Sequence, residues 1–187
     1  MRTMKTKWIV RIPNIITISR ILAVPLIVVA LLMEQPIGGY YAAGLFILAS
    51  IGDYLDGYFA RKYEVVSKLG QFLDPVADKI LVTCTLIMMI PSKGVNPILV
   101  ILLLSRDTLI NGLRAVAAAE NVIIPAGPMG KWKTALQMVA IPAVLIEVPI
   151  FFIPSYWIGI WSLWLSVILS TISGIQYIKI FIDKRGL

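Results

Sequence analysis

The sequence contains no histidine and only one cysteine, Cys84. A single cysteine cannot form a disulfide within the chain, and the absence of histidine removes the commonest general base and metal ligand. Charged residues are also scarce, at 14% of 187 residues, whereas 59% are hydrophobic. Soluble domains are about half apolar and about a quarter charged, so a water-soluble enzyme and a disordered chain are both excluded. Any acid–base or metal chemistry must therefore use carboxylates.

The apolar residues form six runs separated by turn-forming segments rich in proline and glycine. The runs lie at about 15–33, 40–61, 71–91, 97–118, 131–150 and 155–182. Each is close to the roughly 20 residues that an α-helix needs to cross a bilayer. This pattern predicts an all-α polytopic membrane protein with six transmembrane helices. Too few residues remain for a second domain, so we expect one membrane domain over residues 1–187, with residues 1–14 as a retained basic segment at the membrane surface.

The basic residues predict the orientation of these helices. Twelve of them lie at the ends of the apolar runs or beyond them, on one side of the membrane, at Arg2, Lys5, Lys7, Arg11, Arg61, Lys62, Lys68, Lys131, Lys133, Lys179, Lys184 and Arg185. The opposite connections contain only Lys93. Because cytoplasmic loops are enriched in lysine and arginine, both termini are expected in the cytoplasm, in a multi-pass protein of the cell membrane. The net charge of +7 favours anionic lipid or phosphate partners and no nucleic acid.

Four aspartates lie where two neighbouring apolar runs meet the predicted cytoplasmic face. Asp53 and Asp56 are near the end of one run, and Asp74 and Asp78 are near the start of the next. Ionised residues in membrane segments are costly and usually functional. Spacings of three and four residues place each pair on one helix face. A short connection makes the two helices antiparallel neighbours, so we expect the four carboxylates to converge near the cytoplasmic surface.

Four converging carboxylates would repel one another unless cations bind between them. Oxygen ligands without histidine or cysteine favour hard ions, so the pattern predicts two Mg²⁺ or Mn²⁺ ions, as used for attack at phosphorus. A proton or ion relay stays open, as do helix-end salt bridges to Arg61, Lys62, Lys68 and Lys79. Small residues beside the aspartates leave room for a bulky ligand such as a nucleotide, which a relay does not need. These residues are Gly52, Gly57, Ala60 and Gly70.

The same residues form a longer motif, Asp53-x₂-Asp56-Gly57-x₂-Ala60-Arg61-x₈-Gly70-x₃-Asp74-x₃-Asp78. This motif resembles the signature of the CDP-alcohol phosphotransferase family and agrees with it at every fixed position. The resemblance implies transfer of a phosphatidyl or similar group from a CDP-linked donor to an alcohol, with release of CMP, by a homodimer. It implies that all four aspartates hold the metals and that Asp78 is also the general base. The implied CDP-diacylglycerol ligands are Asn14, Thr17, Gly57, Arg61, Ser67 and Gly70.

Three further segments are similar to the phosphatidylglycerophosphate synthase branch of this family, whose acceptor is sn-glycerol 3-phosphate. They are Pro13 to Arg20, Arg106-Asp107 with Arg114, and Gly130 to Thr134 with Gln137. The cations in and beside these apolar runs outnumber Asp107, which favours an anionic acceptor. The expected glycerol 3-phosphate ligands are Arg20, Arg106, Arg114, Lys131 and Lys133.

Several alternatives stay open on the sequence. The acceptor could be serine, inositol phosphate or phosphatidylglycerol, although serine would not need so many cations. A membrane prenyltransferase also uses aspartates and a diphosphate, but with other spacings and more spans. An ion or proton transporter would need polar residues toward the far side of the membrane, where the runs are almost wholly apolar apart from Glu147.

Overall fold

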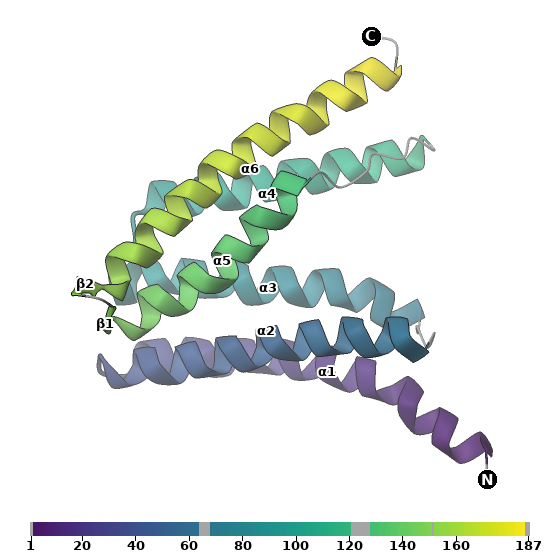
Figure 1. The fold of residues 1–187 in the computed structure, drawn as a ribbon, viewed down its shortest axis with the longest axis horizontal. Coiled ribbons are helices and arrows are strands. Elements are labelled where there is room, and N and C mark those ends of the chain that lie inside the picture. The colour runs from purple at the N-terminus through teal and green to yellow at the C-terminus, as the bar shows by residue number, and fades with distance from the viewer. Residues whose placement is uncertain (1, 64–67, 121–127, 151, 186–187) are drawn as a thin grey trace. The chain divides into compact units, whose positions relative to one another are not determined.

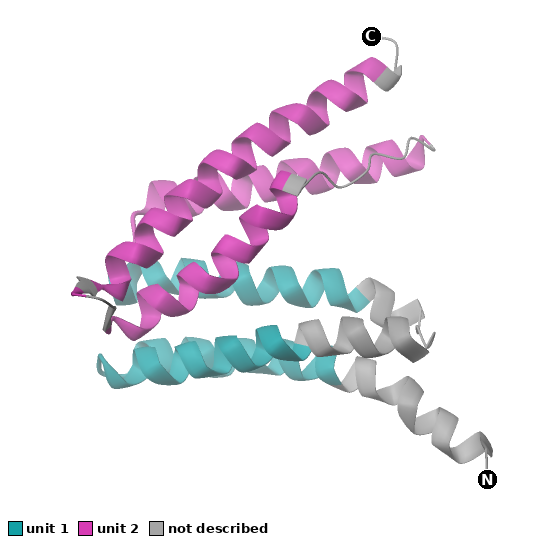
Figure 2. Ribbon diagram, viewed as in Figure 1, with its two compact units in different colours: residues 1–93 teal, residues 94–187 magenta. Residues whose placement is uncertain are grey.

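The computed structural model describes the backbone of residues 2–63, 68–120, 128–150 and 152–185. Side chains are described for residues 16–52, 73–120, 129–148, 152 and 154–183. In these parts of the chain there are six α-helices and one hairpin of two very short strands. The helical fold class is therefore confirmed. The chain divides into two compact units, residues 1–93 and 94–187, each with three of the helices (Figure 2).

The first unit contains α1 (Arg2–Leu32), α2 (Ile37–Tyr63) and α3 (Lys68–Lys93), of which α2 and α3 run in opposite directions (Figure 1). The helix α1 packs along both of the others, whereas α2 and α3 make only a small contact with each other. The predicted neighbours α2 and α3 are thus held together mainly by α1. This helix also begins earlier than the expected apolar run, so the segment predicted to lie at the membrane surface has a helical backbone.

The second unit contains α4 (Pro97–Ala119), α5 (Pro128–Ile146) and α6 (Ser155–Arg185). Asn96 starts α4 because its side-chain oxygen accepts a hydrogen bond from the backbone nitrogen of Ile98 at 2.9 Å, with a proline at the first helical position. The helix α6 packs most extensively against α5 and also contacts α4. The helix α6 therefore holds α4 and α5 together within this unit.

The predicted fifth run extends to residue 150, whereas the helix α5 ends at Ile146. Glu147 has a φ of 54°, which leaves the helical region. The strands β1 (Pro149–Ile150) and β2 (Ile153–Pro154) then pair antiparallel, with the two prolines opposite each other. Prolines lack the N–H that a continuing helix would need, so this sequence turns the chain directly from α5 into α6.

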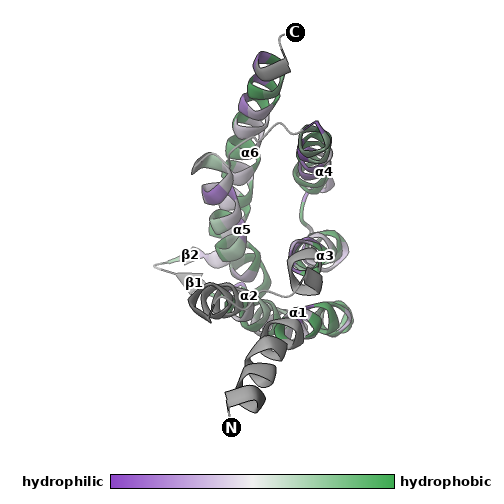
Figure 3. Ribbon diagram, turned by 90° about the vertical axis from the view of Figure 1, so that its right-hand side faces the viewer, coloured by the Kyte–Doolittle hydropathy of each residue, from purple (hydrophilic) through white to green (hydrophobic). Residues whose placement is uncertain are grey.

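Many large apolar side chains are exposed. The helices are hydrophobic along most of their described length (Figure 3). On α6 they recur every three or four residues on one face, at Trp157, Trp161, Leu165, Ile168, Ile172 and Ile175. Exposed apolar faces of this extent are typical of contact with lipid. Among the described residues, the segment Ser155–Asp183 is long and apolar enough to cross a membrane, and Ile16–Leu32 and Ile37–Gly52 are shorter apolar helices. Six crossings and the side of the termini stay predictions.

Gly159 allows α6 to approach α5 at backbone distance. A β-carbon at this position would lie 2.5 Å from Val144 Cγ2 and 2.8 Å from the carbonyl oxygen of Ala140. Small residues at such crossings let membrane helices pack closely. The contact between α5 and α6 therefore depends on the absence of a side chain at residue 159.

We expect Gly159→Val to lower the Tm of the detergent-solubilised protein, because the added methyl groups must push the two helices apart. Overpacking of this kind costs about 1–3 kcal/mol. The matched control is Gly112→Val in α4, where a β-carbon would meet nothing within 4 Å. Equal Tm values for the two variants would contradict the close approach at Gly159.

Candidate functional site

The predicted metal ligands come from two helices of the first unit. Asp53 and Asp56 belong to α2. Asp74 and Asp78 belong to α3 and are four residues apart on that helix. The side chains of Asp53 and Asp56 lie outside the described part of the structure, as do those of Asn14, Arg61 and Ser67 and the surroundings of Gly57 and Gly70. Among the side chains that are described, no three possible metal ligands form a group. The predicted convergence of four carboxylates therefore stays a prediction.

Asp74 is held by two residues of α1. The hydroxyl of Thr17 donates a hydrogen bond to Asp74 Oδ1, and Arg20 Nη2 lies 3.7 Å from the same oxygen. Thr17 and Arg20 are buried, at 0% and 1% exposure, whereas the Asp74 side chain is 39% exposed. The two residues expected to bind substrate thus also fix the orientation of a predicted metal ligand.

This arrangement fits a hard divalent cation at Asp74. Both contacts from α1 use Oδ1, and among the described residues Oδ2 has no partner. A carboxylate oriented through one oxygen can offer the other to an ion, and outer contacts of this kind are typical of metal ligands. The carboxylate is also partly open, as an ion and its substrate would require.

In the second unit, Asp107 of α4 forms ion pairs with two cations. Lys133 Nζ of α5 donates to both carboxylate oxygens, and Arg106 Nη1 lies 3.2 Å from Asp107 Oδ1. Arg106 Nε also donates to the backbone oxygen of Ser170 in α6, at 2.8 Å. Ser166 donates to the backbone oxygen of Lys133 at 3.3 Å. Side chains from all three helices of this unit therefore form one polar cluster.

This cluster changes the expected picture of the acceptor ligands. Arg106 and Lys133 were expected to be in excess over Asp107 and available to an anion, but both pair with that carboxylate. The cluster thus contains two cations and one carboxylate. The Asp107 and Arg106 side chains are 29% and 17% exposed, so the cluster is not sealed from ligands. It can attract an anion, but with less charge than the sequence predicted.

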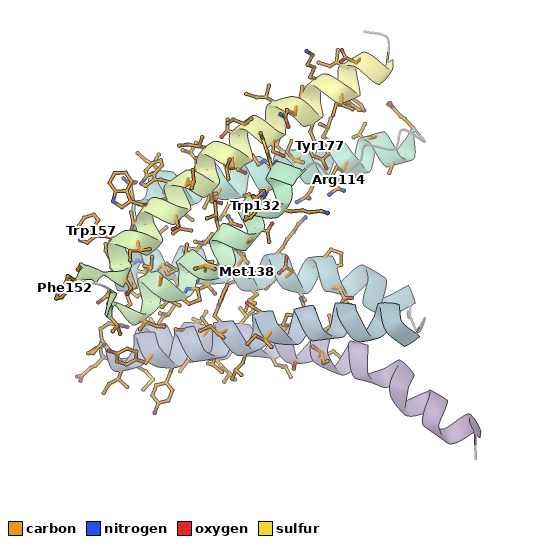
Figure 4. The ribbon with its side chains drawn as sticks, viewed as in Figure 1. Arg114, Trp132, Met138, Phe152, Trp157 and Tyr177 are labelled. Atoms are coloured by element: carbon orange, nitrogen blue, oxygen red, sulfur yellow. The ribbon has the colours of Figure 1, made fainter. Side chains whose placement is uncertain are left out.

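The other two expected acceptor ligands of this unit lie apart from Asp107. Lys131 and Arg114 are exposed. The Arg114 guanidinium lies over the ring of Tyr177 in α6, 5.7 Å from its centroid (Figure 4). This cation–π contact orients Arg114 along the unit's surface. No ion pair is recorded for either residue within the described part of the chain.

Two contacts in this unit were not predicted from the sequence. Ser170 contributes a backbone oxygen and Tyr177 a ring face, and neither contribution has a residue-type signature. One signal was available, because α6 contains buried serines at positions 166, 170 and 173, on one helix face. A polar stripe on such an apolar helix predicts a buried polar partner.

The chain matches the family model for CDP-alcohol phosphatidyltransferase over residues 10–172. It is 39% identical over 171 residues to a protein of Rickettsia bellii named CDP-diacylglycerol–glycerol-3-phosphate 3-phosphatidyltransferase, covering 90% of this chain and 93% of the relative. A Bacillus subtilis protein of the same name is 34% identical over 178 residues, covering 89% and 92%. A rice protein named cardiolipin synthase (CMP-forming) is 34% identical over 148 residues, covering 72% of this chain and 45% of the relative.

Proposed function

The chain belongs to the CDP-alcohol phosphatidyltransferase family, and from this premise we propose that it transfers the phosphatidyl group of CDP-diacylglycerol to sn-glycerol 3-phosphate. The products are phosphatidylglycerophosphate and CMP, in phospholipid biosynthesis. The observation that carries the proposal is the similarity to relatives of this activity over about nine tenths of both chains. The complete aspartate motif supports it independently.

In this reaction Asp53, Asp56, Asp74 and Asp78 would hold two Mg²⁺ or Mn²⁺ ions, which when bound neutralise the donor's diphosphate. Asp78 takes the proton from the primary hydroxyl of glycerol 3-phosphate. The hydroxyl oxygen forms a new ester bond to the donor's β-phosphorus, and the bond from that phosphorus to CMP breaks. Arg61 balances the charge of the departing CMP.

The acyl chains of the donor require a membrane, and the outward-facing apolar stripes of α6 and α1 suit one. We propose a multi-pass protein of the cell membrane whose active site faces the cytoplasm, because the basic connections gather on that side. Donor binding involves Asn14, Thr17, Gly57, Arg61, Ser67 and Gly70. The family resemblance supports a homodimer.

The polar cluster around Asp107 supports an acceptor that carries a phosphate. Its two cations and their hydrogen-bond donors suit a dianion better than the uncharged hydroxyl of serine. Arg106 and Lys133 hold the phosphate in this proposal, and Arg20, Arg114 and Lys131 raise its local concentration.

We expect Lys133→Ala to raise the KM for glycerol 3-phosphate by about 30- to 150-fold, which corresponds to about 2–3 kcal/mol for a charged hydrogen bond. The change also leaves the Asp107 carboxylate less neutralised, which adds repulsion of the phosphate. The KM for CDP-diacylglycerol should change much less. Lys179→Ala, an exposed lysine of α6, is the control and should leave both KM values unchanged. A larger rise in the donor KM would place Lys133 at the donor's diphosphate instead.

The function itself is tested by giving the purified protein CDP-diacylglycerol, Mg²⁺ and labelled acceptors in parallel. The acceptors are glycerol 3-phosphate, serine, inositol phosphate and phosphatidylglycerol, and label is counted in the lipid phase. Fastest incorporation of glycerol 3-phosphate is expected. Faster incorporation of another acceptor would overturn the acceptor but not the family chemistry. This panel includes phosphatidylglycerol because the rice relative is named a cardiolipin synthase.

A further inference from the structure

Gln137 of α5 has a buried side chain for which the structure provides no partner. The residue is 3% exposed, and its amide nitrogen Nε2 is buried without a hydrogen bond among the described residues. Burying an amide in this way is unfavourable, and native proteins pair nearly all such groups. An exception of this kind indicates that something else accepts the hydrogen bond while the protein works.

Gln137 lies next to the Asp107 cluster. It follows Lys133 by one helical turn, so the two residues share a face of α5 with their β-carbons about 6 Å apart. Lys133 forms an ion pair with Asp107 of α4. Arg106, which precedes Asp107 in α4, donates a hydrogen bond to the backbone oxygen of Ser170 in α6. The Ser170 hydroxyl is likewise buried without a partner among the described residues. Two cations of the cluster thus lie beside two polar groups, Gln137 Nε2 and the Ser170 hydroxyl, that have no partner among the described residues.

The unused groups define the chemistry of the missing ligand. The Gln137 Nε2 can only donate, and the Ser170 hydroxyl can donate or accept. Donors beside the two cations Arg106 and Lys133 match an anion with several oxygens, as in a phosphate monoester. An apolar ligand or a cation could not accept a hydrogen bond from Gln137 Nε2.

We propose that Gln137 is a specificity-determining residue that donates a hydrogen bond from Nε2 to a phosphate oxygen of the acceptor. The inference rests on the proposed function, since the phosphate monoester is the acceptor of that reaction. It adds a neutral donor to an acceptor site that the sequence described by its cations alone.

The test is Gln137→Leu, with KM and kcat measured for both substrates in detergent micelles and Tm measured by thermal unfolding. The KM for glycerol 3-phosphate should rise about tenfold or more, and the KM for CDP-diacylglycerol should stay within about twofold. The Tm should stay the same or rise, because leucine replaces a buried amide that has no partner. Gln176→Leu on α6, at an exposed position, is the matched control and should change none of these values.

An unchanged acceptor KM overturns the proposal. So does a variant that fails to fold or loses Tm, because Gln137 would then have a structural partner. An equal rise in both KM values would also overturn it. A second variant, Gln137→Glu, should raise the acceptor KM further than leucine does, since a carboxylate repels the phosphate. Wild-type protein that does not use glycerol 3-phosphate at all contradicts the proposed function instead, so the two failures are distinguishable.

Discussion

Asp74→Asn should reduce transferase activity by at least about 100-fold, because the amide lacks the charge that a hard divalent ion requires. Asp53→Asn and Asp56→Asn should have equally large effects. Addition of Mg²⁺ or Mn²⁺ should raise the Tm of the wild-type protein, since a bound ion stabilises only the folded state. That metal-dependent increase should be lost in Asp74→Asn. EDTA should abolish the transferase activity of the wild-type protein, and addition of either ion should restore that activity.

The Tm measurement separates a metal ligand from a simple ion pair. Arg20 lies 3.7 Å from Asp74, so the carboxylate could serve only to neutralise this buried arginine. In that case Asp74→Asn would lower the Tm in EDTA but leave the metal-dependent increase intact. Asp183→Asn, at an exposed position of α6, controls for the loss of one carboxylate. Activity above about a tenth of wild type in any two of the three aspartate variants would contradict the two-metal site.

The helical segments could be predicted because lipid solvent imposes a simple rule on sequence. Every backbone polar group in a bilayer must be satisfied within its own helix, so long apolar runs between turn signals predict helices well. The predicted run 97–118 corresponds to α4 at Pro97–Ala119. The fifth run was predicted to extend too far, since the turn signal at Pro149 does not reveal that Glu147 already leaves the helical region.

The contacts of the site were less predictable than its residues. Spacing along one helix predicts that Asp74 and Asp78 share a face of α3, but the Thr17 and Arg20 contacts to Asp74 join residues far apart in the chain. Such pairs depend on which helices pack together, and the central position of α1 in its unit has no signature in the hydrophobic pattern. The pairing of Lys133 with Asp107 was missed for the same reason.

The spacing of residues along one helix therefore predicts the kind of reaction better than it predicts which charged side chains pair between helices. The sequence did not reveal that two cations of the second unit, Arg106 and Lys133, pair with Asp107, so their role in binding an acceptor stays a prediction. The family match decides between the transferase and the transporter, which the sequence alone left open.

Asp78→Asn should have a different effect from the three other aspartate changes. Asp78 lies one turn beyond Asp74 on α3 and is expected to take the proton from the acceptor's hydroxyl. Loss of a general base lowers kcat by about 10²–10⁴-fold. Binding of the donor depends on the ions and on the donor's contacts, so Asp78→Asn should still bind CDP-diacylglycerol in the presence of Mg²⁺.

The distinguishing measurement for Asp78 is equilibrium binding of CDP-diacylglycerol with and without Mg²⁺, beside single-turnover rates. Asp78→Asn should keep a donor Kd within a few-fold of wild type while its rate of product formation falls, because asparagine can still offer an oxygen ligand but cannot accept the proton. Asp74→Asn, with the same loss of charge one helical turn away, should lose donor binding as well. If the two variants behave alike, Asp78 is chiefly a metal ligand, and the proton must pass to another group.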